Sequence, residues 1–366
     1  MRITAVRAYR QHQPFVEGGY GTSSGSVAGY DSTIVAVETD EGITGWGEMA
    51  PLGSFYAEAF PAGARAGVAD LASVLIGRDP AQPGRITELM DGAMRGQPYV
   101  KSALDMACWD AAAQGQGRPL CEALGGRFGD AVDLYRAIPP MAPAAAAETA
   151  RRYVADGYRR LQVKVGGDPA ADAERLAAVR DAVGPAIVLF ADANAAWTTG
   201  AALGFMAQTT SLDYTLEQPC RSIGENRTVR EHCQRPLVLD ESIVSLDALL
   251  EAWRHGIADG VTIKLSRVGG VTRASALRDV AVELGLEVTV EDTGGSTIDT
   301  AAMLHVGLST PERHRLHMVD FTSWVTVGNA DGLPAPRDGR LAPSDAPGLG
   351  ITVREAELGD PFFTTG

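Results

Sequence analysis

The sequence predicts an α/β protein in which a (β/α)8-type barrel follows a smaller α+β domain at the N-terminus. From residue 132 onward, short apolar runs alternate with helical patterns eight times, which is typical of a parallel barrel. Before that point, alternating strands followed by helical patterns indicate a separate unit. The 366 residues, 45% of them hydrophobic, are enough for one barrel and one smaller domain.

The first unit is expected to contain three strands and three helices. The strands alternate apolar and polar residues and should form an antiparallel meander, at residues 3–9, 33–38 and 43–48. Helical periodicity follows at residues 60–75, 86–94 and 100–114.

Two loops of this unit differ from ordinary connections. Residues 16–31 are rich in Gly, Ser and Tyr and too long for a simple connector, so we expect a mobile lid or a disordered surface loop. Residues 51–60 form the second loop and carry Phe55 and Tyr56. We expect these two aromatic side chains to contact a substrate.

The barrel follows as eight strands with helices between them. The strands are expected at residues 132–137, 160–165, 186–191, 214–216, 237–239, 260–264, 287–290 and 315–318. Helices are expected between them, for example at residues 143–156 and 168–183. A tail rich in Pro and Gly begins at residue 329.

Three acidic residues, Asp192, Glu217 and Asp240, end three successive apolar runs of the barrel. Each is about one βα unit from the next, so the three should lie on neighbouring strands at the C-terminal edge. A single acid in this place usually caps the next helix, but three together repel one another unless a cation lies between them. Oxygen ligands favour Mg²⁺. No Cys or His lies at the same spacing as the three acids, which argues against zinc. The spacing therefore predicts a Mg²⁺ site.

Two lysines extend the same spacing on either side of the acids. Lys164 and Lys264 lie in otherwise apolar strands, where a charge is costly unless it faces a polar site. In a closed barrel these strands lie on opposite sides of the mouth. The two amines can then act as base and acid on a carboxylate substrate, whose α-proton is lost to give an enediolate that Mg²⁺ stabilises. We expect burial and the nearby cation to push the lysine pKa toward neutrality.

The motifs at these positions occur in a recognisable order, which is Lys164, Asp192-Ala-Asn194, Glu217-Gln-Pro219, Asp240-Glu-Ser242 and Lys264-Leu-Ser266. Together they resemble the enolase superfamily, in particular the muconate lactonizing enzyme branch of the mandelate racemase group. The resemblance covers essentially the whole chain. It implies a capping domain at residues 1–128, a modified TIM barrel at 129–328 and a C-terminal segment at 329–366 that returns to the capping domain. It also implies Mg²⁺ as cofactor, Lys164 and Lys264 as catalytic residues and a homo-oligomer.

Several departures from the family's patterns reduce the number of reactions that the chain could catalyse. The branch often has Lys-x-Lys on the second strand, but here the first position is Gln162. The seventh strand ends in Glu291-Asp-Thr-Gly-Gly295, without the His base of the mandelate racemase type. Asp320 lacks the second acid that dipeptide epimerases typically show two residues later.

The remaining pattern resembles enzymes that act on hydroxyproline and its betaine. No Trp lies in the seventh-strand motif to face a quaternary ammonium, so the resemblance favours dehydration of cis-3-hydroxy-L-proline. The alternative is racemisation or 2-epimerisation of proline betaine, hydroxyproline betaine or another amino-acid derivative. The residues expected to bind the substrate are Phe55, Tyr56, Gln162, Asn194, Glu241, Glu291, Asp292 and Trp324.

Composition and charge argue against nucleic-acid-binding and membrane-binding proteins. A net charge of −14 disfavours nucleic acid and anionic membranes as partners, and leaves a small carboxylate substrate as the expected one. The four cysteines show no paired motif, and the N-terminus lacks a signal-peptide core, so a cytoplasmic protein is expected. A Schiff-base aldolase also places a lysine on a barrel strand, but its reaction does not require three carboxylates at the ends of successive strands. The other alternative is a binding protein that kept the barrel without its chemistry.

Overall fold

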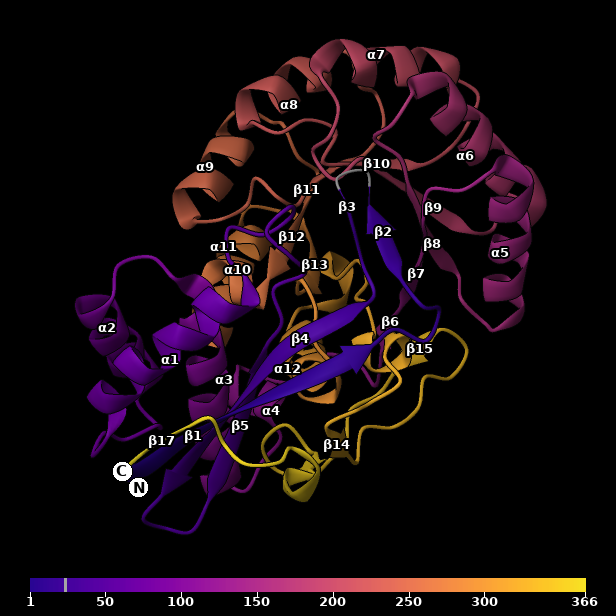
Figure 1. Cartoon of the computed structure of the whole chain (residues 1–366). Helices are drawn as coiled ribbons and strands as arrows, with labels where there is room; N and C mark the ends of the chain where they lie inside the picture. The colour runs from indigo at the N-terminus through magenta and orange to yellow at the C-terminus, as the bar shows by residue number, and fades with distance from the viewer. Residues whose placement is uncertain (23–24) are drawn as a thin grey trace.

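The computed structural model describes residues 1–22 and 25–366, so Ser23 and Ser24 of the expected lid lie outside the described residues. The N-terminal unit is built on a four-stranded antiparallel sheet with the order β17 (Phe363–Thr365), β1 (Ile3–Pro14), β4 (Gly29–Thr39) and β5 (Thr44–Met49). Between β1 and β4, two short strands pair as a hairpin, β2 (Tyr20–Thr22) and β3 (Gly25–Val27). The expected lid thus contains a hairpin, which Figure 1 shows between the sheet and the barrel helices.

The three predicted helices of this unit are confirmed, at α1 (Pro61–Leu75), α2 (Pro83–Ala93) and α3 (Pro98–Gly115), with a short α4 (Leu120–Ala123) behind them. Helix α3 is buried on almost every face because it lies between β5 and the barrel. Two glycines of β5 allow this approach. A Cβ on Gly45 would lie 2.1 Å from the Ala107 carbonyl oxygen, and one on Gly47 would lie 2.0 Å from that of Ala103.

Replacing Gly47 with alanine should therefore destabilise the fold strongly. The obstructing atom is a helix carbonyl, which cannot move without shifting α3, so we expect a loss of about 3 kcal/mol in the free energy of unfolding. Denaturant unfolding measures this loss. Gly84→Ala is the matched control, because a Cβ on Gly84 of α2 meets nothing within 4 Å. Equal stabilities of the two variants would contradict the packing described.

The barrel consists of seven parallel strands in sequential order, from β7 to β13. The strands are β7 (Tyr135–Ile138), β8 (Arg160–Lys164), β9 (Val188–Asp192), β10 (Thr215–Glu217), β11 (Leu237–Leu239), β12 (Gly260–Lys264) and β13 (Glu287–Glu291). Figure 1 shows helices covering the outside of these strands. They are α5 (Pro143–Ala155), α6 (Pro169–Val183), α7 (Thr199–Gln208), α8 (Ile223–Arg230), α9 (Leu246–Arg254), α10 (Leu265–Val268), α11 (Val271–Glu283) and α12 (Thr297–Leu308).

The first and last predicted barrel strands need correction. Residues 132–137 do not form one strand, because β6 (Val132–Asp133) pairs antiparallel with β15 (Arg340–Leu341) and only β7 joins the barrel. Residues 315–318 form single bridges instead of a regular strand, from Arg315 to Val288 and from Met318 to Leu134. These bridges connect β13 to β7 and close the ring of strands. The final repeat is therefore modified, as the resemblance implies.

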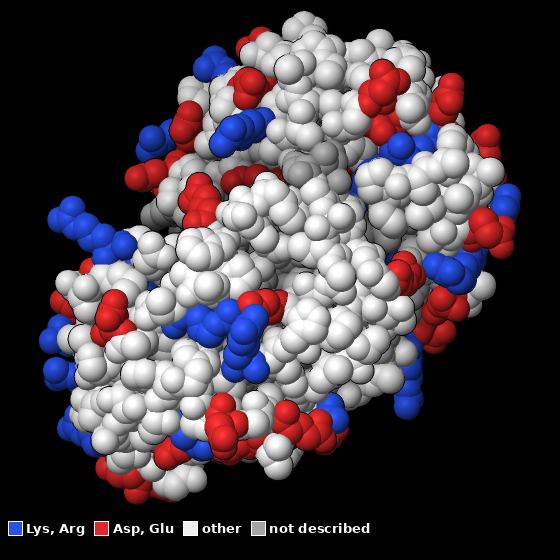
Figure 2. Space-filling model, in the orientation of Figure 1, with Lys and Arg blue, Asp and Glu red and all other residues white. Residues whose placement is uncertain are grey.

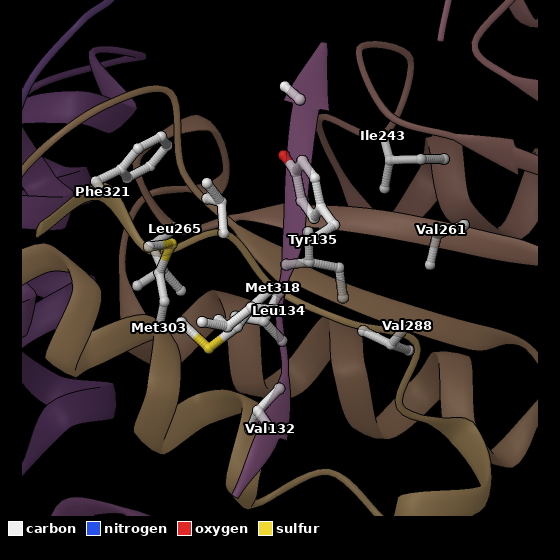
Figure 3. Close-up of a cluster of buried hydrophobic side chains, with 14 of the residues drawn as sticks. Val132, Leu134, Tyr135, Ile243, Val261, Leu265, Val288, Met303, Met318 and Phe321 are labelled. Atoms are coloured by element: carbon white, nitrogen blue, oxygen red, sulfur yellow. The ribbon is translucent and has the colours of Figure 1, made fainter. Parts of the chain in front are cut away.

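The apolar interior joins the barrel and its neighbours in one large cluster. Figure 3 shows Leu134, Met303 and Met318 packed together on the side of the barrel where β7 lies. In the same view the hydroxyl of Tyr135 points along the direction of its strand, away from the apolar side chains. The core thus ends at the C-terminal edge of the strands, where polar groups begin.

The chain after the barrel runs back along both units. Short strands β14 (Ala330–Asp331) and β16 (Thr352–Val353) pair with each other, and β17 pairs with β1 through Thr365 opposite Val6. Short 3-10 turns lie at Glu312–His314, Phe321–Trp324 and Glu355–Glu357. The C-terminal residues thus complete the edge of the first sheet.

Charged side chains of both signs are interspersed over the face shown in Figure 2. Some exposed charges of the chain form pairs, such as Arg85 with Glu88 and Arg151 with Glu148. Exposed pairs of this kind add little stability, so the fold depends mainly on its apolar core. In the described part of the chain, no helix is both long and apolar enough to span a bilayer.

Candidate active site

Strand register aligns most of the predicted residues at one edge of the barrel. Lys164 is the direct neighbour of Asp192 across β8 and β9, and Asp192 is the neighbour of Glu217 across β9 and β10. On the far side, Lys264 ends β12 opposite Glu291 of β13. Asp240 follows β11 immediately. The C-terminal ends of six neighbouring strands therefore carry the chemistry.

Lys164 is buried against the first carboxylate. Its Nζ lies 2.5 Å from Asp192 Oδ2, and both side chains are at most 5% exposed. The same carboxylate accepts hydrogen bonds from the backbone and side-chain nitrogens of Asn194, at 2.8 and 3.0 Å. Asn194 holds a left-handed backbone, with φ of 45°, which turns the chain back over Asp192.

Lys264 lies among three oxygen-bearing groups on the opposite side. Its Nζ is 2.8 Å from Glu291 Oε2 and 3.0 Å from Asp240 Oδ2, and it donates a hydrogen bond of 2.8 Å to the Tyr56 hydroxyl. Tyr56 comes from the N-terminal unit, so a residue of the second loop reaches the barrel mouth as predicted. Only three lysines occur in the whole chain, and two of them meet strand-end carboxylates here.

Arg267 is a member of the site that the sequence reasoning missed. Its guanidinium donates to the carbonyl and to Oδ1 of Asp240, at 3.0 and 2.5 Å, and to the Tyr56 hydroxyl at 3.2 Å. It lies three residues after Lys264, on the short helix α10. That offset places it one helical turn beyond the strand end, which is a signal that could have identified it.

The three carboxylates crowd one another without solvent. Asp192, Glu217 and Asp240 are each at most 2% exposed. Burial, followed by the charges of Asp192 and Asp240, raises the pKa of Glu217 well above its ordinary value. Burial also acts on Asp240, but Arg267 and Lys264 outweigh it and hold the pKa at about 2.

The donor set suits a hard divalent cation, because it consists of carboxylates from neighbouring strands without His or Cys. Within residues 1–22 and 25–366, however, no three acidic, His or Cys side chains stand ready to hold a metal. Lys164 pairs with Asp192, and Lys264 and Arg267 pair with Asp240. The assignment of the three acids as Mg²⁺ ligands stays a prediction.

The expected lowering of the lysine pKa depends on a nearby cation, and the carboxylates that contact the two lysines act in the opposite direction. Burial acts to lower the pKa of Lys264, but the charges of Asp240 and Glu291 outweigh it and raise the pKa well above the ordinary value. The pKa of Lys164 is raised in the same way, since burial lowers it but Asp192, Tyr20 and Glu217 together outweigh burial. In these pairs both lysines are ammonium groups, because each contacts a carboxylate directly.

An inner cavity lies between the two lysines and is covered by the N-terminal unit. Its walls are Tyr20, Tyr30, Leu52, Tyr56, Tyr135, Lys164, Asn194, Lys264, Glu291, Asp292, Thr293, Phe321 and Trp324. The free volume of the cavity is about 30 Å³, little more than one water molecule. An amino acid can therefore enter only if lining side chains or the covering loop move.

Five of the residues predicted to bind a substrate line this cavity, namely Tyr56, Asn194, Glu291, Asp292 and Trp324. Glu291 already has protein partners, because it contacts Lys264 and accepts a hydrogen bond from the Tyr135 hydroxyl. Asp292 accepts hydrogen bonds from the backbone nitrogens of Ser266 and Thr293.

The other three predicted substrate contacts lie elsewhere. Gln162 is two residues before Lys164, one layer deeper in the barrel, and donates a 2.8 Å hydrogen bond to Glu217. Phe55 and Glu241 line an outer pocket of about 600 Å³, and Phe55 is 37% exposed. Burial, with Asp240 and Asp192 nearby, raises the pKa of Glu241 to about 7. These residues do not face the inner cavity.

Three tyrosines of the inner cavity were also missed, namely Tyr20, Tyr30 and Tyr135. Tyr20 lies on the β2–β3 hairpin and packs 5.0 Å from the Trp324 ring, so the hairpin covers the barrel mouth. Tyr135 is the first residue of β7, so the strand-end position that marks the lysines and the acids does not indicate it. Nothing in the local sequence of Tyr20 or Tyr30 distinguishes them from surface tyrosines.

Two family profiles cover most of the chain. The family described as "Mandelate racemase / muconate lactonizing enzyme, N-terminal domain" matches residues 3–125. The family described as "Enolase C-terminal domain-like" matches residues 145–357.

Similar proteins extend over the full length. The cis-3-hydroxy-L-proline dehydratase of Roseibium aggregatum is 42% identical over 362 residues, 99% of each chain. The N-succinyl-L-Arg/Lys racemase of Bacillus cereus is 29% identical and covers 98% of this chain and 97% of its own. A magnesium complex from Roseovarius nubinhibens, assigned to the mandelate racemase/muconate lactonizing enzymes, superposes with a TM-score of 0.96 at 38% identity over 100% of both chains.

Proposed function

The chain belongs to the mandelate racemase/muconate lactonizing enzyme family of the enolase superfamily, and on that basis we propose that it dehydrates cis-3-hydroxy-L-proline with the help of Mg²⁺. The observation that carries the proposal is the position of Lys164 and Lys264. Both line one inner cavity, and strand-end carboxylates lie between them. Similarity over 99% of the dehydratase from Roseibium aggregatum supports the choice of substrate.

Asp192, Glu217 and Asp240 would hold the Mg²⁺. When bound, the ion supplies positive charge beside the substrate carboxylate, which stabilises the enediolate more than the ground state. The carboxylates are buried, and Asp192 and Asp240 would exchange their lysine and arginine partners for the ion. The magnesium complex of the Roseovarius nubinhibens protein supports this choice of metal.

The stereochemistry of the substrate explains why two lysines are needed. In cis-3-hydroxy-L-proline the hydroxyl lies on the same face of the ring as the carboxylate, so the C2 hydrogen lies on the opposite face from the hydroxyl. One lysine, as the neutral amine that it becomes once it leaves its carboxylate partner, takes the proton from C2, and the other side of the cavity donates a proton to the departing hydroxyl. Water leaves, a C2–C3 double bond forms, and the resulting enamine becomes the cyclic imine by proton transfer.

Asp292 is the group in the cavity best placed to bind the ring ammonium. Its carboxylate is 1% exposed and lines the cavity beside Lys264 and Glu291. Unlike Glu291, it has no lysine or arginine partner among the described residues. The aromatic rings of Tyr56 and Trp324 supply apolar surface for the ring carbons.

Epimerisation is the second candidate, because two bases on opposite sides of C2 can also invert that carbon. The substrate would be proline betaine, hydroxyproline betaine or another amino-acid derivative. Trp324 and Tyr56 favour this reading, since both offer aromatic faces to a quaternary ammonium. The racemase of Bacillus cereus shows that such chemistry occurs among similar chains.

Incubation of the enzyme with cis-3-hydroxy-L-proline in D2O, followed by NMR, tests the proposal. We expect the signals of the hydroxylated carbon to disappear and those of a cyclic imine to appear. EDTA should stop the reaction and Mg²⁺ should restore it. L-Proline, which has no hydroxyl to lose, serves as a control that exchanges its C2 hydrogen without elimination.

Incorporation of deuterium at C2 of proline betaine with inversion, and no imine from the hydroxyproline, would favour the epimerase instead. Absence of both reactions across these substrates would contradict the proposed chemistry. The homo-oligomeric state and the cytoplasmic location stay predictions.

A further inference from the structure

Glu217 differs from the other two strand-end acids in its partners. Asp192 and Asp240 each form a salt bridge with a lysine of the site. Glu217 is 2% exposed, and no lysine or arginine in the described part of the chain lies within salt-bridge distance of it. A buried carboxylate without a cationic partner depends on other donors, so the groups that hold Glu217 require an explanation.

Two neutral side chains donate to the Glu217 carboxylate, one to each oxygen. The amide nitrogen of Gln162 lies 2.8 Å from Oε2, and the hydroxyl of Thr262 lies 3.4 Å from Oε1. Gln162 is on β8 and Thr262 is on β12, whereas Glu217 ends β10, which lies between them with one strand on each side. The carboxylate is therefore held from both directions across the barrel interior.

The two donors occupy the same position relative to the two lysines. Gln162 and Lys164 are separated by one residue of β8, and Thr262 and Lys264 by one residue of β12. Alternate side chains of a strand point to the same face, so both donors lie one layer below the lysines. They are 2% and 0% exposed, and neither lines the inner cavity. Their contact with the site is through Glu217.

The Gln162 amide is placed at a cost to its own hydrogen bonding. Its Oε1 atom is buried and has no donor among the described residues. The residues opposite it on the neighbouring strands are Ala137 and Phe190, whose side chains are apolar. An apolar residue at position 162 would avoid the cost of the unpaired oxygen. The amide provides what such a residue would lack, namely the hydrogen bond to Glu217.

We propose that Gln162 and Thr262 are positioning residues that hold the Glu217 carboxylate in one orientation for binding Mg²⁺ together with Asp192 and Asp240. This inference rests on the metal site of the proposed function. Because both donors are neutral, they orient the carboxylate without cancelling the charge that attracts a cation. Loss of a hydrogen-bond partner behind a metal ligand typically lowers metal affinity by about 10- to 100-fold.

Isothermal titration calorimetry with Mg²⁺ alone tests this role without any substrate. Gln162→Met keeps the length of the side chain but removes the donor, so we expect the affinity to fall by at least about 10-fold. Thr262→Val removes the longer of the two hydrogen bonds and should lower the affinity by about 3-fold.

Thr289→Val is the matched control for these variants. Thr289 lies directly opposite Thr262 on β13 and is 1% exposed, and its hydroxyl has no hydrogen-bond partner among the described residues. The same change of a buried threonine to valine, one strand away, should therefore leave the Mg²⁺ affinity as it is. A loss as large as that of Thr262→Val would overturn the proposal.

A double variant separates positioning from a general effect on the barrel. If Gln162 acts through Glu217, then Gln162→Met should cause no further loss of Mg²⁺ affinity in the Glu217→Gln protein. The same loss in both backgrounds, or full affinity in the single Gln162→Met variant, would overturn the proposal. If Gln162→Met does not fold, the two threonine variants decide in its place.

The inference and the proposed function can fail separately. If the affinities change as expected but the protein turns over none of the substrates, the proposed reaction fails and the positioning of Glu217 stands. If the protein dehydrates its substrate and Glu217→Gln weakens Mg²⁺ binding, but Gln162→Met does not, the inference fails and the proposed function stands.

Discussion

Replacing either Lys164 or Lys264 with methionine is expected to lower the rate of dehydration by at least about 10³-fold, because each removes the group that moves a proton on one side of the cavity. Methionine keeps the length of the side chain and fills its space, so the barrel should remain folded. Steady-state kinetics with cis-3-hydroxy-L-proline measure the loss, and circular dichroism checks the fold.

The two variants should differ in a second reaction. The C2 hydrogen and the hydroxyl lie on opposite faces of the substrate, so one lysine acts as the base at C2 and the other faces the leaving group. Exchange of the C2 hydrogen of L-proline in D2O should be lost in one variant and retained in the other. Lys101→Met is the matched control, because Lys101 is also buried but pairs with Asp91 in the N-terminal unit. Full dehydration activity in either active-site variant would remove that lysine from the mechanism.

Substitution of the strand-end acids should produce the other large effect. Asp192→Asn, Glu217→Gln and Asp240→Asn each remove a charge that would hold Mg²⁺, and each is expected to weaken Mg²⁺ binding by at least about 100-fold. Isothermal titration calorimetry measures the affinity, and activity should fall in parallel. Unchanged affinity in all three variants would contradict the assignment of the metal site.

Glu217→Gln should also raise the free energy of unfolding in EDTA. The other two acids lie beside Glu217, and its replacement relieves repulsion that no Mg²⁺ offsets in that buffer. Glu88→Gln, at a side chain 69% exposed, is the control and should change stability little. Acids kept for binding a metal often reduce the stability of the free protein, and this comparison measures that cost.

The fold could be predicted well where local periodicity and packing agree. Strands such as 237–239 and 260–264 were predicted at their observed bounds, because a buried parallel strand is a short apolar run with clear ends. The errors lie at the seam of the barrel. There, β6 pairs with β15 from a distant part of the chain, and residues 315–318 make single bridges, which no local pattern reports.

The site could be predicted where the end of a strand determines the position of a functional side chain. Lys164, Asp192 and Glu217 share one register row, which equal spacing along the chain indicates. The sequence could not show how deep in the barrel each side chain lies or which hydrogen-bond partners it has. Gln162 lies one layer below the cavity, and the backbone N–H of Asp299 donates to Glu48 of the N-terminal unit. Such relations depend on tertiary contacts between distant segments.

A crystal structure with Mg²⁺ and L-proline tests the central claim most directly, because L-proline cannot eliminate water. We expect the ion to be bound by oxygens of Asp192, Glu217 and Asp240, with the amines of Lys164 and Lys264 on opposite faces of C2. An ion bound elsewhere, or two lysines still paired with the carboxylates while L-proline occupies the cavity, would contradict the account.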